Sequence, residues 1–194
     1  GLVGSALAVW RLLAGRAQRR IWLARSAGVG LLAAAAVLWS TWRLANIPTF
    51  QLFGKIVPRV DTSAPLVALT LDDGPTARYT DEVLRILQQE GVPATFFVVG
   101  RALERNPELC QQIVAQGHEL GNHSSSPLPM LLQPYALIRD EVERTDQLIR
   151  NCGQQGEIHF RSPYGKKLVL LPYYLAGSST VNRGHVHHRS TRAF

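Results

Sequence analysis

Short apolar runs alternate with amphipathic stretches along the chain from residue 66 onward. The runs at 66–71, 94–99 and 158–160 have the length and the β-branched and aromatic content of buried strands, and a short strand is also predicted at 119–121. Between these runs, apolar residues recur at helical spacing. Strands and helices that alternate in this way are typical of an α/β protein with a parallel sheet or barrel, which is the fold class we predict.

The stretches between the strands carry signals for the start and the end of helices. Asn106 and Pro107 are residue types favoured at a helix N-cap and at the first helical position, and Gly117 follows the last periodic residue. Helices are therefore predicted at 79–90, 106–116 and 137–151, with a shorter one at 168–175.

An uncharged stretch near the N-terminus has the composition of a membrane span. The seventeen residues 26–42 contain no charged side chain, and this length is at the short end of the spanning range. Trp39 and Trp42 suit an interfacial aromatic belt, and the arginines that precede the stretch suit the cytoplasmic side. We therefore predict a single-pass anchor in the cell membrane, with the globular part outside the cytoplasm.

Two alternatives to this anchor stay open. The stretch also has the hydropathy of a buried core helix and of a secretory signal peptide, and cleavage of a signal peptide would yield a secreted protein. Residues 46–48, Asn-Ile-Pro, do not form a convincing cleavage site, which favours an uncleaved anchor.

The net charge of +7 arises in the N-terminal region. Residues 1–60 hold eight Arg or Lys and no acidic residue, whereas residues 61–194 hold thirteen basic and fourteen acidic side chains. A domain that binds nucleic acid needs a basic face on its folded part. The nearly neutral globular part therefore excludes nucleic acid as the main partner.

The chain has two cysteines, Cys110 and Cys152. Outside the cytoplasm two thiols are able to pair, but sequence alone does not show whether their separation can be bridged. Both lie in or beside predicted helices, and we expect two free thiols. Neither belongs to a Cys-x-x-Cys motif of the kind that binds zinc or acts in redox chemistry.

Two adjacent carboxylates, Asp72 and Asp73, end the first predicted strand, and a Gly-Pro dipeptide follows them. Like charges repel, and a buried carboxylate is costly unless it is paired or bound to a metal, so this pair is a poor choice for a core. The carboxyl ends of strands are where α/β enzymes build their sites. The alternative is a surface turn, because Asp-Gly is a common turn dipeptide.

Two later segments favour a site. Residues 117–124 are Gly-His-Glu-Leu-Gly-Asn-His-Ser, and residues 161–165 are Arg-Ser-Pro-Tyr-Gly. Together with Thr-Leu-Asp-Asp-Gly-Pro at 70–75, they follow the order and spacing of motifs in the polysaccharide deacetylases of the NodB-homology type, carbohydrate esterase family four. The chain resembles this family over roughly residues 49–176. The resemblance implies a distorted (β/α) barrel, here incomplete because too few residues follow Thr70 for the closing strands.

The resemblance also implies roles for five residues. Asp72 matches the general base, and Arg161 matches the residue that orients this base through its planar guanidinium. Asp73 and His123 match ligands of a divalent metal, expected to be zinc, for which carboxylate oxygen and imidazole nitrogen are suitable donors. Tyr164 matches the residue whose backbone N–H helps to hold the oxyanion. His118, five residues before His123, is interpreted as structural.

Two departures from the family pattern bear on this site. Pro127 stands four residues after His123, where the family has a second histidine, so the third protein ligand is missing. The segment 177–194 has no apolar periodicity and lacks the later family motifs, including the histidine that serves as general acid. Its own histidines, at positions 185, 187 and 188, are predicted to belong to a solvated tail, with weak metal binding as the alternative.

We therefore predict a metal-dependent hydrolase that removes N-acetyl groups from a cell-surface or extracellular polysaccharide of the peptidoglycan or chitin type. The alternative is a degenerate, non-catalytic glycan-binding protein of the same fold, which the two departures favour. The predicted organisation is a basic cytoplasmic segment, a transmembrane anchor, a linker, a partial deacetylase domain and an irregular basic tail, at residues 1–25, 26–43, 44–64, 65–176 and 177–194.

Overall fold

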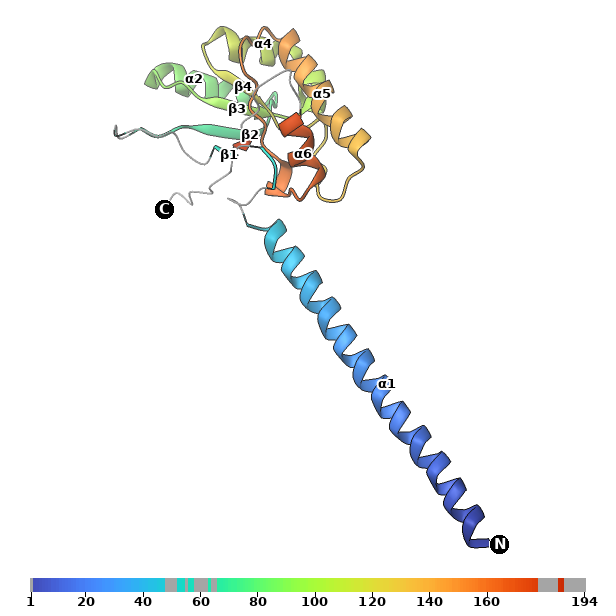
Figure 1. Cartoon of the computed structure of the whole chain (residues 1–194). Coiled ribbons are helices and arrows are strands. Elements are labelled where there is room, and N and C mark those ends of the chain that lie inside the picture. Colours follow the sequence, from blue (N-terminus) through green and yellow to red (C-terminus); the bar gives the residue numbers. More distant parts are fainter. Residues whose placement is uncertain are drawn as a thin grey trace. The chain divides into compact units, whose positions relative to one another are not determined.

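The computed structural model describes residues 2–47, 52–54, 56–57, 63, 66–177 and 185–186 of the chain (Figure 1). The chain divides into two compact units, Gly1–Leu44 and Ala45–Phe194. The finer division into anchor, linker, domain and tail stays a prediction.

Helix α1 (Leu2–Ala45) accounts for the first unit and is continuous over 44 residues. Its segment Gln18–Leu44 is long and apolar enough to cross a membrane, with a mean hydropathy of 1.8, and none of it is buried. This segment extends beyond the uncharged residues 26–42 on which the sequence prediction rests. Length and composition fit a membrane span and a signal sequence alike, because both are apolar helices.

Three parallel strands form the larger sheet of the second unit, in the order β2-β3-β4. They are β2 (Thr70–Gly74), β3 (Thr95–Val98) and β4 (Glu119–Asn122). Phe160 extends the sheet by a parallel bridge to Asn122. Neighbouring strands follow one another in the chain and are joined by helices, which is the connectivity of a β/α barrel wall. Over the described residues this wall is an incomplete barrel, as the sequence predicts.

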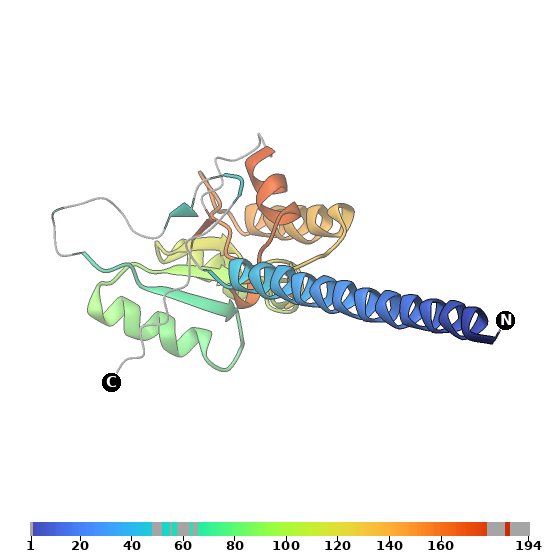
Figure 2. The same ribbon diagram turned by 60° about the horizontal axis from the view of Figure 1, so that its bottom comes forward.

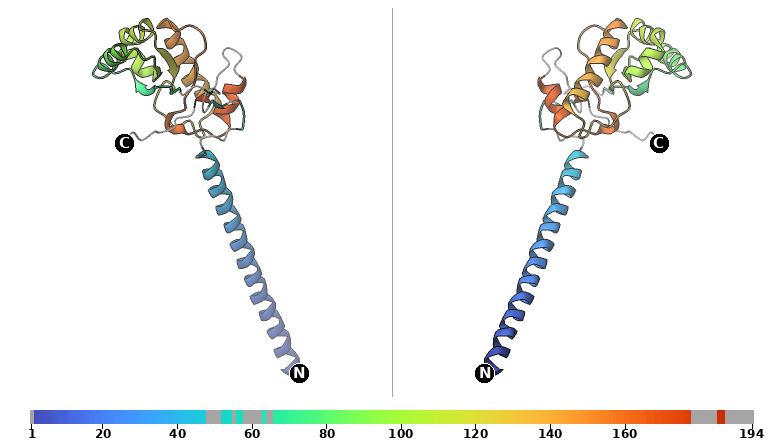
Figure 3. Two further views of the ribbon diagram at one scale, coloured as in Figure 1. Left: turned by 90° about the vertical axis from the view of Figure 1, so that its left-hand side faces the viewer. Right: turned by 90° about the vertical axis from the view of Figure 1, so that its right-hand side faces the viewer.

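Helices α2, α4 and α5 follow one another around the sheet in chain order (Figures 1 and 3). The helical elements of this unit are α2 (Thr80–Glu90), α3 (Gly100–Arg105), α4 (Pro107–Ala115), α5 (Tyr135–Asn151), the 3-10 turn η1 (Pro163–Gly165) and α6 (Leu170–Gly177). The four helices predicted from periodicity all occur, with bounds shifted by one or two residues. The sequence does not predict α3, because six residues are too few for a periodic pattern.

Two apolar clusters fill the interior of the second unit. The larger one packs β3 and β4 against α2 and α4, with buried side chains that include Leu84, Phe96, Val98, Ile113 and Leu120. The smaller one lies around α5 and α6, which Figure 2 shows side by side, and contains Met130, Ile138, Val142, Phe160, Leu171, Tyr174 and Leu175. Each large apolar side chain buried in this way contributes roughly 1.5–3 kcal/mol to the stability of the fold. This packing holds the strands that carry the cleft residues in place.

The strand assignments need three corrections. β2 begins at Thr70 instead of at residue 66, and Leu66 and Val67 are 74% and 93% exposed. These apolar residues precede the part of the chain that pairs with β3, so no neighbouring strand covers them within the three-stranded sheet. The strand predicted at 158–160 is reduced to the single bridge of Phe160. Conversely, β5 (His185–Val186) lies in the segment predicted to be irregular, and it pairs with β1 (Ile56–Val57) of the predicted linker.

Cys110 and Cys152 form a disulfide, so the expectation of two free thiols is wrong. Cys110 lies in α4 and Cys152 caps α5, and their Cα atoms are 5.7 Å apart, within the span that a disulfide bridges. The sequence does not reveal this proximity, because it arises when both helices pack against β4. A disulfide that closes a loop of this length contributes about 3–4 kcal/mol.

Candidate active site

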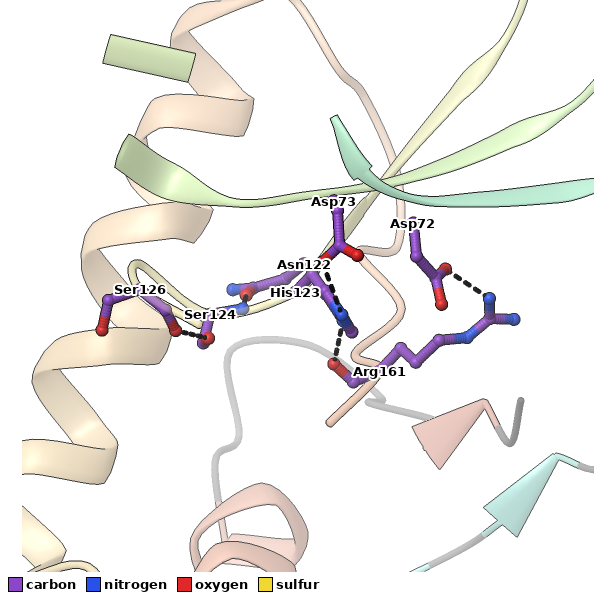
Figure 4. Close-up of polar contacts among 7 residues, drawn as sticks. All are labelled: Asp72, Asp73, Asn122, His123, Ser124, Ser126 and Arg161. Carbon is purple, nitrogen blue, oxygen red and sulfur yellow. Dashed lines mark hydrogen bonds and ion pairs between the residues drawn. The ribbon is translucent and has the colours of Figure 1, made fainter. Parts of the chain in front are cut away.

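A cleft of about 820 Å³ opens at the C-terminal ends of the three strands. Its lining contains all five residues for which the family resemblance implies a role, namely Asp72, Asp73, His123, Arg161 and Tyr164. They come from β2, from the segments that follow β4 and Phe160, and from η1, and Figure 4 shows four of them. Parallel strands end at one edge of a sheet, so segments far apart in the sequence meet here.

An irregularity in β2 places both aspartates at this cleft. Asp72 is in register with Phe97 and Gly74 with Val98, so Asp73 is an extra residue in the strand. Its φ of 69° lies in the left-handed region, which Asp tolerates better than most residues do. Neighbouring side chains of a regular strand point to opposite faces, whereas this bulge lets two consecutive carboxylates line one cleft.

Arg161 holds the Asp72 carboxylate. Its Nη1 donates to Asp72 Oδ1 at 2.6 Å and to Thr70 Oγ1 at 3.0 Å. The guanidinium carbon lies 3.9 Å from the centroid of the Phe97 ring, which adds a cation–π contact. The Arg161 side chain is 4% exposed and that of Asp72 is 22% exposed, so water screens the ion pair less than it screens a surface pair. Because three neighbours hold the guanidinium, the Asp72 carboxylate is kept at the cleft in one preferred orientation.

Asp73 and His123 form a second pair beside the first (Figure 4). The His123 Nε2 atom lies 3.6 Å from Asp73 Oδ1, and His123 Nδ1 lies 2.7 Å from the Arg161 carbonyl oxygen. A carbonyl accepts hydrogen bonds and does not donate them, so Nδ1 carries the proton and the lone pair of the neutral ring is on Nε2. This imidazole nitrogen and the neighbouring carboxylate oxygen are donors that suit a divalent ion.

Pro127 also lines the cleft, and its side chain has no atom that binds a metal. Among the residues that the structure describes, no three His, Cys, Asp or Glu side chains are grouped so that they could hold a metal ion. The donor chemistry of Asp73 and His123 fits a divalent ion, but the described residues provide two protein ligands where catalytic zinc has three.

The turn η1 carries Tyr164, whose φ of 57° is also left-handed. The N–H groups of the next two residues and the Ser162 hydroxyl close the turn through hydrogen bonds of 2.6–3.1 Å. The Tyr164 N–H takes part in none of these bonds, so it is available to an acceptor from outside the turn.

A buried carboxylate that the sequence analysis misses anchors the segment that contains His123. Glu141 of α5 accepts hydrogen bonds from the Ser126 N–H at 2.7 Å and from the Ser126 hydroxyl at 2.8 Å. The Asn122 amide donates to Asp146 Oδ1, also in α5, at 2.7 Å. The segment is therefore tied to α5 on both sides of His123. The signal that could have identified Glu141 is its position beside Ile138 and Val142 on the buried face of α5.

Replacing Glu141 with Leu is expected to lower the free energy of unfolding by roughly 2–5 kcal/mol, because a buried N–H and a buried hydroxyl lose their acceptor. Urea denaturation of the full chain in an uncharged detergent measures this change. Asp140→Leu removes an exposed carboxylate from the same helix and serves as the control. Equal losses in the two variants would show that the Ser126 contact contributes nothing.

His118 lies away from the cleft, as its interpretation as a structural residue requires. Its Nδ1 accepts from the Ala94 N–H at 3.3 Å, and burial lowers the pKa of its imidazole below the ordinary value of 6.5. His187, His188 and the side chain of His185 lie outside the described part of the chain, and so the prediction for these histidines stays a prediction.

Comparison with known proteins identifies relatives of the chain. The family model for polysaccharide deacetylase matches residues 59–176. A chitooligosaccharide deacetylase of Sinorhizobium fredii is 40% identical over 112 residues, which are 57% of this chain and 52% of that protein. The chain thus spans about half the length of the curated relatives it matches.

Solved structures of the same fold include a deacetylase and a pseudoenzyme. The peptidoglycan N-acetylglucosamine deacetylase Bc1960 matches with a TM-score of 0.58 and 28% identity, over 61% of this chain and 54% of that chain. A wild-type pseudoenzyme of carbohydrate esterase family four from Bacillus anthracis matches with a TM-score of 0.56 and 26% identity, over 62% of this chain and 42% of that chain.

Proposed function

Because the chain belongs to the polysaccharide deacetylase family, we propose that its cleft hydrolyses the N-acetyl groups of a cell-envelope polysaccharide. The observation that carries this proposal is that one open cleft contains both an oriented carboxylate, Asp72, and a pair of metal-donor side chains, Asp73 and His123. Amide hydrolysis is accelerated by a general base that takes a proton from water and by an electrophile that polarises the carbonyl. Two of the relatives are named for chitooligosaccharide and peptidoglycan, so we propose an N-acetylated amino-sugar polymer as the substrate class.

Asp72 is proposed as the general base. It takes a proton from water as the water oxygen bonds to the acetyl carbon, and the C–N bond then breaks as this proton passes from Asp72 to the nitrogen. The products are acetate and a free amine on the sugar. A positioned base of this kind contributes roughly 10²–10⁴-fold to the rate. The ion pair with Arg161 keeps the Asp72 carboxylate in place for this transfer.

Asp73 and His123 are proposed to hold a divalent metal, expected to be zinc. When bound, the ion supplies Lewis-acid polarisation of the acetyl carbonyl. The Arg161 carbonyl keeps the lone pair of His123 on Nε2, while the Arg161 side chain orients Asp72. One residue thus positions both the base and a metal ligand, so substitutions that move its backbone should affect both.

The backbone N–H of Tyr164 is proposed to donate to the oxyanion that forms on the acetyl oxygen. The turn holds this residue through hydrogen bonds that do not use its own N–H. A donor that is already in position needs no reorganisation when the charge develops, which is the advantage of an oxyanion hole.

The full chain in detergent, incubated with chitooligosaccharides and with peptidoglycan in the presence of zinc, tests this proposal through acetate release. Metal analysis of the same sample, purified without a His tag, tests the proposed metal site. Acetate release that requires the metal supports the proposal, and no release from either polymer contradicts it.

A second candidate function is glycan binding without turnover. The observation that favours it is Pro127, which leaves the described cleft with two metal ligands. A chain that binds N-acetylated oligosaccharides but releases no acetate, with or without added zinc, would establish this alternative.

We also propose that α1 anchors the chain in the cell membrane, with the second unit outside the cytoplasm. The spanning segment Gln18–Leu44 contains the uncharged stretch 26–42, and the arginines that precede this stretch, at positions 16, 19, 20 and 25, favour the cytoplasmic side. The disulfide between Cys110 and Cys152 supports the external location, because disulfides persist in oxidising compartments.

Protease added to intact cells is expected to digest the second unit, while a cytoplasmic marker protein stays intact. Alkylation before lysis should leave Cys110 and Cys152 unmodified, because their sulfurs are joined. If the second unit is protected and its thiols are alkylated, it lies in the cytoplasm and the proposed topology is wrong.

A further inference from the structure

Helix α3 lines one side of the cleft with two arginines that the proposed reaction does not use. Arg101 and Arg105 are both exposed and both belong to the cleft lining. They are four residues apart, so they project from the same face of the helix. The charged residues of the lining are three arginines and two aspartates, and the third arginine, Arg161, is already paired with Asp72.

Neither Arg101 nor Arg105 has an ion-pair partner within the described part of the chain. No ion pair or side-chain hydrogen bond joins either arginine to another described residue. Glu104 lies between them in sequence but is paired with Arg144 of α5, with 2.7 Å between Glu104 Oε1 and Arg144 Nη2. The acidic side chain of α3 is thus paired with a residue of α5, and the side chains that α3 contributes to the cleft carry positive charge.

The backbone of α3 is anchored to both segments that carry the proposed metal ligands. At its start, the Gly100 and Arg101 N–H groups donate to the carbonyls of Ser124 and Ser125, at 2.9 and 3.0 Å, immediately after His123. At its end, the side chain of the capping residue Asn106 donates through Nδ2 to the Pro75 carbonyl at 3.3 Å, two residues after Asp73.

The start of α3 also packs closely against its surroundings. A Cβ atom at Gly100 would come within 2.7 Å of the Thr145 hydroxyl and 3.0 Å of the Ser125 Cα. These contacts therefore fix the position of α3, and of its two arginines, relative to Asp73 and His123.

We propose that Arg101 and Arg105 bind carboxylate groups of the substrate, so that the cleft selects a carboxylate-bearing N-acetylated glycan over a neutral one. This inference rests on the proposed function and specifies its substrate class. The planar guanidinium matches a carboxylate with two parallel hydrogen bonds. Unpaired positive charges that line a cleft also concentrate anionic ligands there. The sugar to be deacetylated lies beside Asp72, and its acidic neighbour lies along α3.

Three labelled tetrasaccharides test this assignment by their affinity for the full chain in an uncharged detergent. The first alternates N-acetylglucosamine with N-acetylmuramic acid, which carries a carboxylate. The second is the same glycan with its carboxylates converted to methylamides, and the third is the neutral N-acetylglucosamine tetramer. We expect the acidic glycan to bind about tenfold more tightly than the other two, with a smaller difference at high salt because of screening.

The double variant Arg101→Gln, Arg105→Gln is expected to lose this preference and to bind all three glycans equally. The variant Arg85→Gln, Arg139→Gln loses the same charge from exposed positions on α2 and α5 and should keep the preference. Equal affinity of the wild-type chain for the three glycans, or no binding of any of them, overturns the inference, as does a preference that survives in the first variant. Acetate release is scored separately, so failure of the proposed hydrolysis is distinguishable from failure of carboxylate selection.

Discussion

Asp72→Asn is expected to reduce acetate release by about 10²–10⁴-fold, because an amide does not accept the proton that the carboxylate removes from water. Asparagine keeps an oxygen that accepts from Arg161, so the fold and the metal ligands should stay in place. The wild-type chain is itself expected to be slow, because the third metal ligand is missing. The assay therefore measures the substitution in the wild-type chain and in one that carries Pro127→His.

Asp140→Asn makes the same chemical change at an exposed position on α5 and should leave acetate release unchanged. Urea denaturation should give Asp72→Asn a midpoint close to that of the wild-type chain. Unaltered acetate release in the Asp72→Asn variant would remove Asp72 from the role of base. Release by the wild-type chain at an ordinary enzymatic rate, about 1–10³ per second, would contradict the degenerate alternative.

Pro127→His is expected to tighten zinc binding by at least 10–100-fold, because loss of even an indirect partner of a metal ligand costs about that much. Pro127 lines the same cleft as Asp73 and His123, so an imidazole at this position supplies the missing donor from the correct side. Calorimetric titration of the full chain with zinc measures the change. Acetate release should rise together with metal affinity.

Pro127→Ala is the matched control, since it removes the proline ring without adding a donor. If the wild-type, Pro127→Ala and Pro127→His chains bind zinc equally tightly, another residue supplies the third ligand and the proposed ligand set is incomplete. If zinc binding rises in Pro127→His without any acetate release, the missing ligand does not account for the lack of turnover, and the glycan-binding alternative gains support.

The positions of the cleft residues were largely predictable from the sequence, because each motif lies at the end of a predicted strand. The carboxyl ends of parallel strands meet at one edge, so Asp72, His123 and Arg161 were expected to converge, and they do. The sequence was misleading where burial decides the outcome. The apolar pattern at 66–69 predicts a strand, but Leu66 and Val67 precede the pairing with β3 and are largely exposed.

The amino-acid sequence by itself determined the α/β class, the order of helices and strands and the candidate site residues, since periodicity and motif order are local properties of the chain. It also determined the lack of a metal donor at Pro127. Tertiary structure alone decided the contacts that depend on packing between distant segments. These contacts are the disulfide between two helices, the Glu141 anchor of the His123 segment, and the placement of the α3 arginines along the cleft. Local sequence patterns do not identify the partners in these contacts, because the separation of the partners in space is set by how the helices pack on the sheet.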